Sequence, residues 1–236
     1  MKIYNSSECE IGIDEKSTYI IKYKKAFYKL DKGQFIEIFG EKELKFQREI
    51  KDSPMIAVIM TFAIISTVVY YLFTEKYVIL DKNIIIANVV LFFNIFIHEM
   101  GHIIALKLFL PESTVDFGFK MFFIYPSFYV DTSSTYLIPK YKRIAVYLSG
   151  NFMNCLYLII CYFVIKNMNE YNYLVVSNII INFIPIIKSD GYYAFKTLLN
   201  QYNYNKTKMK NYVEDTVRGI LMFIFLNILS CLNAYL

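Results

Sequence analysis

The chain of 236 residues has no tryptophan, only 2 histidines, and few glycines and prolines, 8 and 5 respectively. So little glycine and proline excludes a collagen-like chain and a flexible linker protein. Disorder is excluded as well, because 56% of the residues are hydrophobic and 22 Tyr and 21 Phe are present, whereas disordered chains are poor in aromatic and other apolar residues. A soluble domain is usually about 45–50% apolar, so this chain is too hydrophobic for an ordinary one.

Cysteines are also few. The 4 that are present include no CxxC pair, so we expect neither a thiolate zinc site nor a disulfide framework. Three of them fall in apolar segments, where a cysteine packs as a small hydrophobic residue. The first 52 residues contain no continuous apolar run followed by a small-residue cleavage site, so a removable signal peptide is not expected.

Charged residues make up 19% of the chain, with a formal net charge of +5, but they are unevenly distributed. No basic face with interleaved readout residues is present, so we expect no nucleic-acid partner. Residues 1–52 carry many charges of both signs, whereas several later stretches of about 20 residues carry almost none. This pattern is typical of a polytopic membrane protein with a polar head.

Five apolar segments approach the roughly 20 residues that a bilayer requires, and they cover residues 54–73, 83–109, 143–165, 171–187 and 217–236. With five spans, 22 of the 25 Lys and Arg residues lie on the side of the N-terminus, which predicts a cytoplasmic N-terminus. We expect an all-α multi-pass protein embedded in the lipid bilayer. Its domains would be an N-terminal region, 1–53, and a transmembrane domain, 54–236.

The N-terminal region offers no recognisable catalytic chemistry. Tyr19–Ile21 and Ala26–Leu30 have the composition of strands, and Asp31–Gly33 predicts a turn before an extended segment, Gln34–Phe39. Alternating charges predict a helix over Glu41–Lys51. We expect this region to dock or stabilise the rest of the chain.

The connection 110–142 is rich in aromatic residues, contains Pro126, and is too short and interrupted for another span. We expect a re-entrant or surface hairpin here, because open strand edges at membrane depth must be buried in protein. Two interpretations remain open. The hairpin is either a packed loop at the membrane surface or an edge strand that receives an extended substrate.

An HExxH motif, His98 to His102, lies in the second apolar segment. Residues four apart share one helical face, so both imidazoles can reach one zinc ion. Glu99, rotated by about 100°, can act as the general base. These are the only histidines in the chain, and the chance of this arrangement is on the order of a few in ten thousand. Ionisable residues within a membrane span are costly and indicate function.

A catalytic zinc site uses three protein ligands and an open position for water, so a third ligand must come from elsewhere. Asp190 ends the fourth apolar segment. Asp190 lies 19 residues after Tyr171, and His102 lies 19 residues after Asn83. At 1.5 Å per residue each separation is roughly 28 Å along a helix, so the two groups can share one depth on the cytoplasmic side. Three other carboxylates remain as alternatives, namely Asp131, Asp116 and Glu112.

Three sequence blocks, 98–102, 149–154 and 182–191, resemble motifs of the site-2 proteases, which are intramembrane zinc metalloproteases. The resemblance implies that Asp190 is a zinc ligand and that Asn182 helps to hold the substrate backbone. It implies packing or a substrate contact for Asn154. The chain departs from the family pattern at Asn151, where proline is usual, and at Ser189, where leucine is common.

Within this family the chain is most similar to the bacterial peptide zinc metalloproteases, on the basis of Tyr129–Asp131 and of the paired Tyr192 and Tyr193. This resemblance implies a bacterial cell membrane protein whose partner is a peptide or membrane-protein substrate. It also implies maturation of a secreted, modified, bacteriocin-like peptide. The alternatives are cleavage of a membrane-bound regulator such as an anti-sigma factor, and a non-catalytic immunity protein that binds a peptide.

Overall fold

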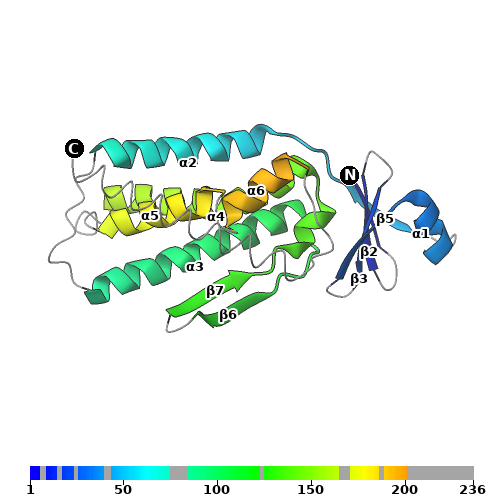
Figure 1. The fold of residues 1–236 in the computed structure, drawn as a ribbon, viewed down its shortest axis with the longest axis horizontal. Helices are drawn as coiled ribbons and strands as arrows, with labels where there is room; N and C mark the ends of the chain where they lie inside the picture. The colour runs from blue at the N-terminus through cyan, green and yellow to red at the C-terminus, as the bar shows by residue number, and fades with distance from the viewer. Residues whose placement is uncertain are drawn as a thin grey trace.

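The computed structural model has a helical body with a β-sheet at one end of its long axis (Figure 1). Because the sheet has five strands, the fold is mixed rather than purely all-α as expected. The structure describes nine parts of the chain: residues 1–5, 9–14, 18–23, 26–39, 44–74, 84–122, 125–164, 171–185 and 189–200.

Three helices are long and apolar enough to cross a membrane: α2 (Met55–Thr74), α3 (Ile84–Phe109) and α4 (Lys140–Val164). They agree with the first three apolar segments. Helix α4 is the central one, since it packs against α2, α3 and α6. The predicted fifth span, 217–236, lies outside the described residues.

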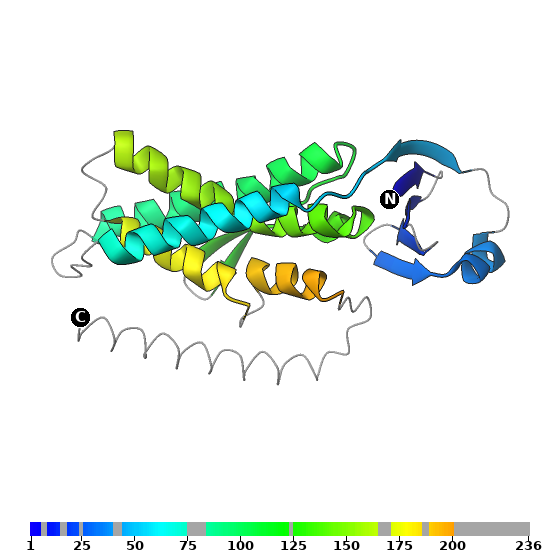
Figure 2. The same cartoon turned by 90° about the horizontal axis from the view of Figure 1, so that it is seen from above.

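The fourth apolar segment does not form a full span. Helix α5 (Asn172–Phe183) has 12 residues, which is about 18 Å at 1.5 Å per residue. It ends because Ile184 is extended, with φ −71° and ψ 125°, and the following Pro185 disfavours a helical conformation at that position. A separate helix, α6 (Asp190–Leu198), begins after the break, as Figure 2 shows.

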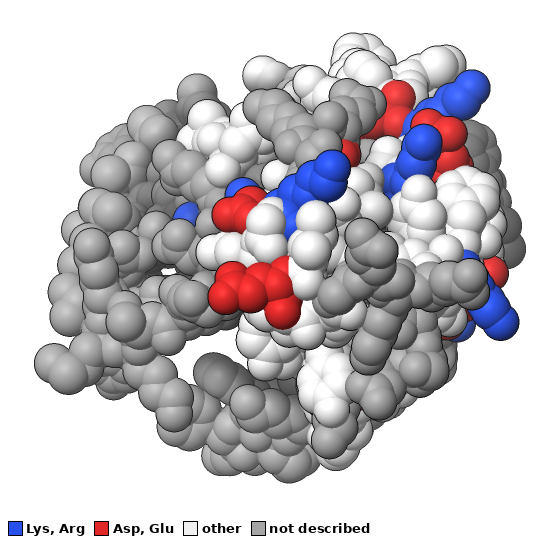
Figure 3. All heavy atoms as spheres, turned by 90° about the vertical axis from the view of Figure 1, so that its right-hand side faces the viewer, with Lys and Arg blue, Asp and Glu red and all other residues white. Residues whose placement is uncertain are grey.

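The sheet at the other end consists of five antiparallel strands in the order β4-β3-β2-β1-β5. The strands are β1 (Lys2–Asn5), β2 (Cys9–Ile13), β3 (Tyr19–Tyr23), β4 (Ala26–Leu30) and β5 (Lys45–Glu49). The two strand predictions, at Tyr19–Ile21 and Ala26–Leu30, are confirmed. On the end of the molecule that faces the viewer in Figure 3, acidic and basic residues are interspersed.

Two other local predictions for this region are wrong. The segment expected to be extended forms helix α1 (Lys32–Phe39). Asp31 and Gln34 stabilise its start, because the side chain of each accepts a hydrogen bond from the backbone of the other, at 2.8 and 3.1 Å. The predicted helix over Glu41–Lys51 is instead strand β5 within its described part. Its backbone pairs with β1, and its charged residues suit the edge of a sheet.

Both faces of the sheet are covered. Successive residues of a strand point to opposite faces, so Ile21 packs with Phe35 of α1, whereas Ile20 packs with Leu106 of α3 and Leu137. The cluster that contains Ile20 also includes Val146 of α4. The sheet is therefore continuous with the core of the helical body rather than a separate head.

The hairpin expected between residues 110 and 142 is present. Strands β6 (Phe117–Phe122) and β7 (Tyr125–Val130) pair antiparallel, and β7 lies against α3. Phe128 contacts the rings of Phe92 and Phe96, with centroids 5.2 and 5.7 Å apart. A short 3-10 helix, η1 (Ser133–Leu137), then leads into α4.

Candidate metal centre

Helices α3 and α6 bring together the three residues expected to hold zinc. Oδ2 of Asp190 lies 2.8 Å from Nε2 of His98 and 3.1 Å from Nε2 of His102, and the two Nε2 atoms are 3.3 Å apart. Both imidazoles are buried. Within the described residues, this is the one cluster of three or more His, Cys, Asp or Glu side chains close enough to share a metal ion.

Glycines on α3 and α4 permit this arrangement. A Cβ atom at Gly150 would lie 2.6 Å from Nε2 of His98 and 2.7 Å from Nε2 of His102. A Cβ atom at Gly101 would lie 2.6 Å from the carbonyl oxygen of Ser149. All three distances are shorter than real Cβ contacts, so side chains at these positions would force the two helices apart and move the imidazoles.

The hydrogen bonding of His102 selects the tautomer that a metal requires. Its Nδ1 lies 2.8 Å from the carbonyl oxygen of Val146, and a carbonyl can only accept, so Nδ1 carries the proton. The lone pair of Nε2 is then directed toward His98 and Asp190. Backbone carbonyls commonly orient metal-binding histidines in this way.

The partner of His98 is Asn154. Nδ2 of the Asn154 side-chain amide lies 3.2 Å from Nδ1 of His98. The Oδ1 atom of this buried amide has no partner in the described part of the chain. The oxygen and nitrogen of a side-chain amide are assigned from their surroundings. If the amide is turned over, Oδ1 accepts a hydrogen bond from Nδ1–H, and Nε2 of His98 becomes available to a metal.

Asp190 reaches the histidines because α5 and α6 are separate helices. Ser189 is extended, with φ −98° and ψ 179°, and Asp190 is the first residue of α6. A carboxylate in the first helical turn is favoured by the helix dipole. Gly191 permits the start of α6 to approach the end of α5 closely, since a Cβ atom at this position would clash with the carbonyl oxygen of Phe183.

These three residues fit a zinc ion. Imidazole nitrogens and carboxylate oxygens bind zinc at about 2.0–2.2 Å, and tetrahedral geometry then places the ligand atoms about 3.3 Å apart. The observed separations, 2.8 to 3.3 Å, are close to this value. The tautomer of His102 and the acceptor available to His98 are also those that metal binding requires.

Glu99 lies next to this cluster and also contacts the hairpin. Its carboxylate interacts electrostatically with both imidazoles and with Asp190, and it accepts a hydrogen bond from the backbone N–H of Val130. Since Val130 is the last residue of β7, the hairpin ends beside the expected general base.

The three alternative carboxylates lie elsewhere. Glu112 forms an ion pair with Arg48 at 3.1 Å. Oδ1 of Asp131 accepts the backbone N–H of Ser133 at 2.9 Å, and the backbone carbonyl of Asp116 accepts the N–H of Asp131 at 2.9 Å. None of them belongs to the cluster around the two histidines.

Asn182, expected to hold the substrate backbone, belongs to a chain of amides. Its Nδ2 donates to Oδ1 of Asn178 at 2.9 Å, and Nδ2 of Asn178 donates to Oδ1 of Asn94 at 2.6 Å. Asn94 is buried one helical turn before His98. This chain connects the end of α5 to the metal-binding face of α3.

Sequence reasoning did not identify several contributors to this centre: the carbonyl of Val146, the close approach at Gly150, and the amides of Asn94 and Asn178. Every residue has a carbonyl group, so the role of Val146 leaves no signal in the sequence. The placement of Asn94 one turn before His98, within an apolar helix, is a signal that could have been used.

The chain is similar in sequence to a known protein. The chain is 32% identical over 150 residues to a Bacillus subtilis (strain 168) protein named "Putative peptide zinc metalloprotease protein YydH". The match covers 59% of this chain and 58% of that protein, so the chain spans less than two thirds of its relative. The chain matches no protein-family model and no solved structure.

Proposed function

We propose that this chain is a zinc metalloprotease that hydrolyses a peptide bond of a membrane-associated substrate. One observation carries the proposal: ligand atoms of His98, His102 and Asp190 converge within 3.3 Å of one another, with Glu99 beside them. Helix α3, which carries both histidines and Glu99, is apolar enough to cross a membrane. The similarity to a protein named as a peptide zinc metalloprotease supports the same chemistry.

In this proposal His98, His102 and Asp190 hold the zinc ion. A bound zinc ion lowers the pKa of a coordinated water toward about 7 and polarises the scissile carbonyl. Glu99 accepts the proton of the attacking water and later delivers it to the leaving amine. General acid–base catalysis of this kind contributes about 10²–10⁴-fold to the rate.

The substrate must present an extended backbone, since a helical peptide keeps its carbonyls in internal hydrogen bonds. We propose that β7 guides the substrate as an added strand, and the position of Val130 beside Glu99 supports this role for the hairpin. Asn182 is proposed to hydrogen-bond the substrate backbone, with Asn178 and Asn94 orienting its amide.

The resemblance to the site-2 proteases supports cleavage at membrane depth on the cytoplasmic side. The similar Bacillus protein is named as a peptide zinc metalloprotease, which supports a peptide substrate. The resemblance to the bacterial peptide zinc metalloproteases supports a secreted, modified peptide precursor, which we propose as the substrate. Accumulation of the uncleaved precursor in cells that lack this activity, measured by mass spectrometry, would support this choice of substrate.

The central test compares the purified wild-type chain with Glu99→Gln. Both proteins should contain about one zinc ion per chain, because Glu99 is not a ligand in this proposal. The variant should cleave a mixed synthetic peptide library at least 10²-fold more slowly. Wild-type turnover by Glu99→Gln would contradict the mechanism. A wild-type protein that binds zinc without cleaving any peptide would favour a non-catalytic peptide-binding protein.

A further inference from the structure

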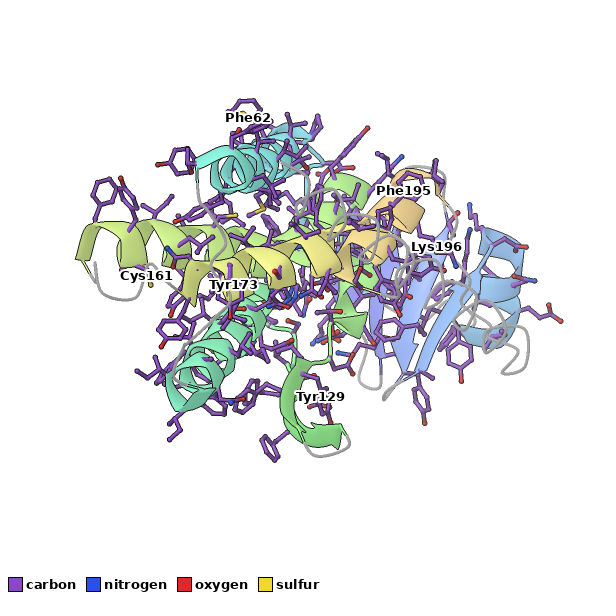
Figure 4. All side chains as sticks on the ribbon, turned by 60° about the vertical axis from the view of Figure 1, so that its left-hand side comes forward. Phe62, Tyr129, Cys161, Tyr173, Phe195 and Lys196 are labelled. Atoms are coloured by element: carbon purple, nitrogen blue, oxygen red, sulfur yellow. The ribbon has the colours of Figure 1, made fainter. Side chains whose placement is uncertain are left out.

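A polar cavity of about 410 Å³ lies beside the candidate metal centre, and the proposed function does not yet use it. The hairpin, the segment that follows it, and helices α4 and α6 all contribute to its lining. The side chains that decide its chemistry are Asp116, Tyr129, Asp131, Tyr136, Tyr147 and Tyr193. Figure 4 shows Tyr129 on the hairpin, on the opposite side of the molecule from Phe62 of α2.

Three connections place the cavity next to the reacting groups. Val130 lines it and donates its backbone N–H to Glu99. Tyr147 lines it and directly follows Val146, whose carbonyl accepts the hydrogen bond from Nδ1 of His102. Tyr193 lines it one helical turn after Asp190. A peptide bond held at the metal centre would therefore have a neighbouring side chain within reach of the cavity.

The lining has the chemistry of a site for a cation. Two carboxylates, on Asp116 and Asp131, can form charge-assisted hydrogen bonds with an ammonium or guanidinium group. The rings of Tyr147 and Tyr193 lie 5.8 Å apart and offer aromatic surface to an aliphatic stem and to the charge that ends it. The hydroxyl of Tyr147 is already engaged with Thr135, at 3.1 Å, so it is the ring of Tyr147 that is available.

We propose that this cavity is a specificity subsite that binds a lysine or arginine side chain of the substrate near the scissile bond. The inference rests on the proposed function and narrows it to peptides with a basic residue at one fixed distance from the cleaved bond. It also gives a role to the side chains of Tyr129, Asp131 and Tyr193, which the catalytic mechanism leaves unused.

Arg143 is a cation of the protein that lies close to the cavity. The guanidinium of Arg143 lies over the ring of Tyr136, 5.3 Å from its centroid. Its N–H groups donate to the carbonyls of Thr135, Tyr136 and Ile138. Arg143 offsets part of the negative potential of the cavity but is not among the residues that line it, whereas Asp116 and Asp131 are.

The first experiment uses the purified full chain with zinc and a mixed synthetic peptide library, with cleaved bonds identified by mass spectrometry. Lysine and arginine should be enriched at one position relative to the cleaved bond. Matched peptides with lysine, norleucine or glutamate at that position should then differ in KM. The lysine peptide should have a KM about 10-fold lower than the norleucine peptide, which corresponds to about 1.4 kcal/mol.

Two variants connect this preference to the cavity. Asp116→Asn and Asp131→Asn should each lower the ratio of the two KM values toward one. Asparagine at position 131 keeps the Oδ1 acceptor for Ser133 and removes only the charge. Glu112→Gln is the matched control, since Glu112 lies on the same connection but pairs with Arg48, and it should keep the wild-type ratio.

The outcomes separate this inference from the proposed function. Cleavage without a cationic preference, or a preference for glutamate, would overturn the subsite and leave the protease intact. Persistence of the lysine preference in both aspartate variants would also overturn it. If the N-terminal ammonium were the true ligand, the lysine and norleucine peptides would have equal KM values and acetylation of both would raise these values, and this result too would count against the proposal. Absence of any cleavage by the wild-type protein would instead refute the proposed function and the subsite with it.

Discussion

Helices α2 and α4 are both apolar enough to cross a membrane, yet the protein uses them in opposite ways. Only 17% of the most apolar stretch of α2 is buried, against 67% for α4. The outward residues of α2 are large and apolar, such as Phe62 and Phe73. Helix α4 buries Ser149, Asn151 and Asn154.

The difference shows where a membrane helix can carry chemistry. A polar group that faces lipid has no hydrogen-bond partner and costs several kcal/mol, so α2 carries almost none on its exposed side. Helix α4 is enclosed by α2, α3 and α6, and two of its buried polar side chains, Ser149 and Asn154, lie within hydrogen-bond distance of the histidines. The predictions below test this contrast, beginning with the change expected to have the largest effect.

Asp190→Ala should have the largest effect on metal binding. It removes one of three ligands and leaves two buried imidazoles, so zinc affinity should fall by more than about 100-fold, which exceeds the loss typical of outer contacts. Zinc analysis of the purified variant measures this without any assay of activity. Glu112→Ala should retain full zinc and serves as the control. Full zinc in Asp190→Ala would assign the ligand to another carboxylate.

Asn154→Leu tests the buried polar face of α4. The change keeps the approximate volume of the side chain and removes the acceptor for Nδ1 of His98, so zinc affinity should fall by about 10–100-fold. Competition with a chelator of known affinity gives this value. Asn154→Asp should restore most of it, because a carboxylate oxygen accepts the same hydrogen bond. Equal affinities for all three proteins would show that Asn154 acts only in packing.

Phe73→Ala tests the exposed face of α2 and should have the smallest effect. Phe73 is 87% exposed, so its removal should change the free energy of unfolding by less than about 0.5 kcal/mol. Zinc content should be unchanged. Thermal unfolding of the purified protein in detergent measures the first quantity. A large loss of stability would mean that α2 packs against protein on this side.

Local patterns predicted much of the architecture. Long apolar segments identified α2, α3 and α4, because a helix that crosses a membrane must be apolar over most of its length. The aromatic stretch around Pro126 identified the hairpin. The errors arose where local patterns were ambiguous. Alternating charges at Lys45–Glu49 suit either a helix or an edge strand, and only pairing with β1 decides between them.

The sequence by itself predicted the chemistry that we propose for this protein. Two histidines four apart on a helix, followed in the chain by several carboxylates, indicate a zinc site before any fold is known. Only the tertiary structure shows which carboxylate lies beside the two histidines. Asp190 lies 88 residues after His102, and the break at Pro185 with the close packing at Gly150 brings them together. Such long-range convergence depends on packing between helices, and no periodicity within one helix can encode it.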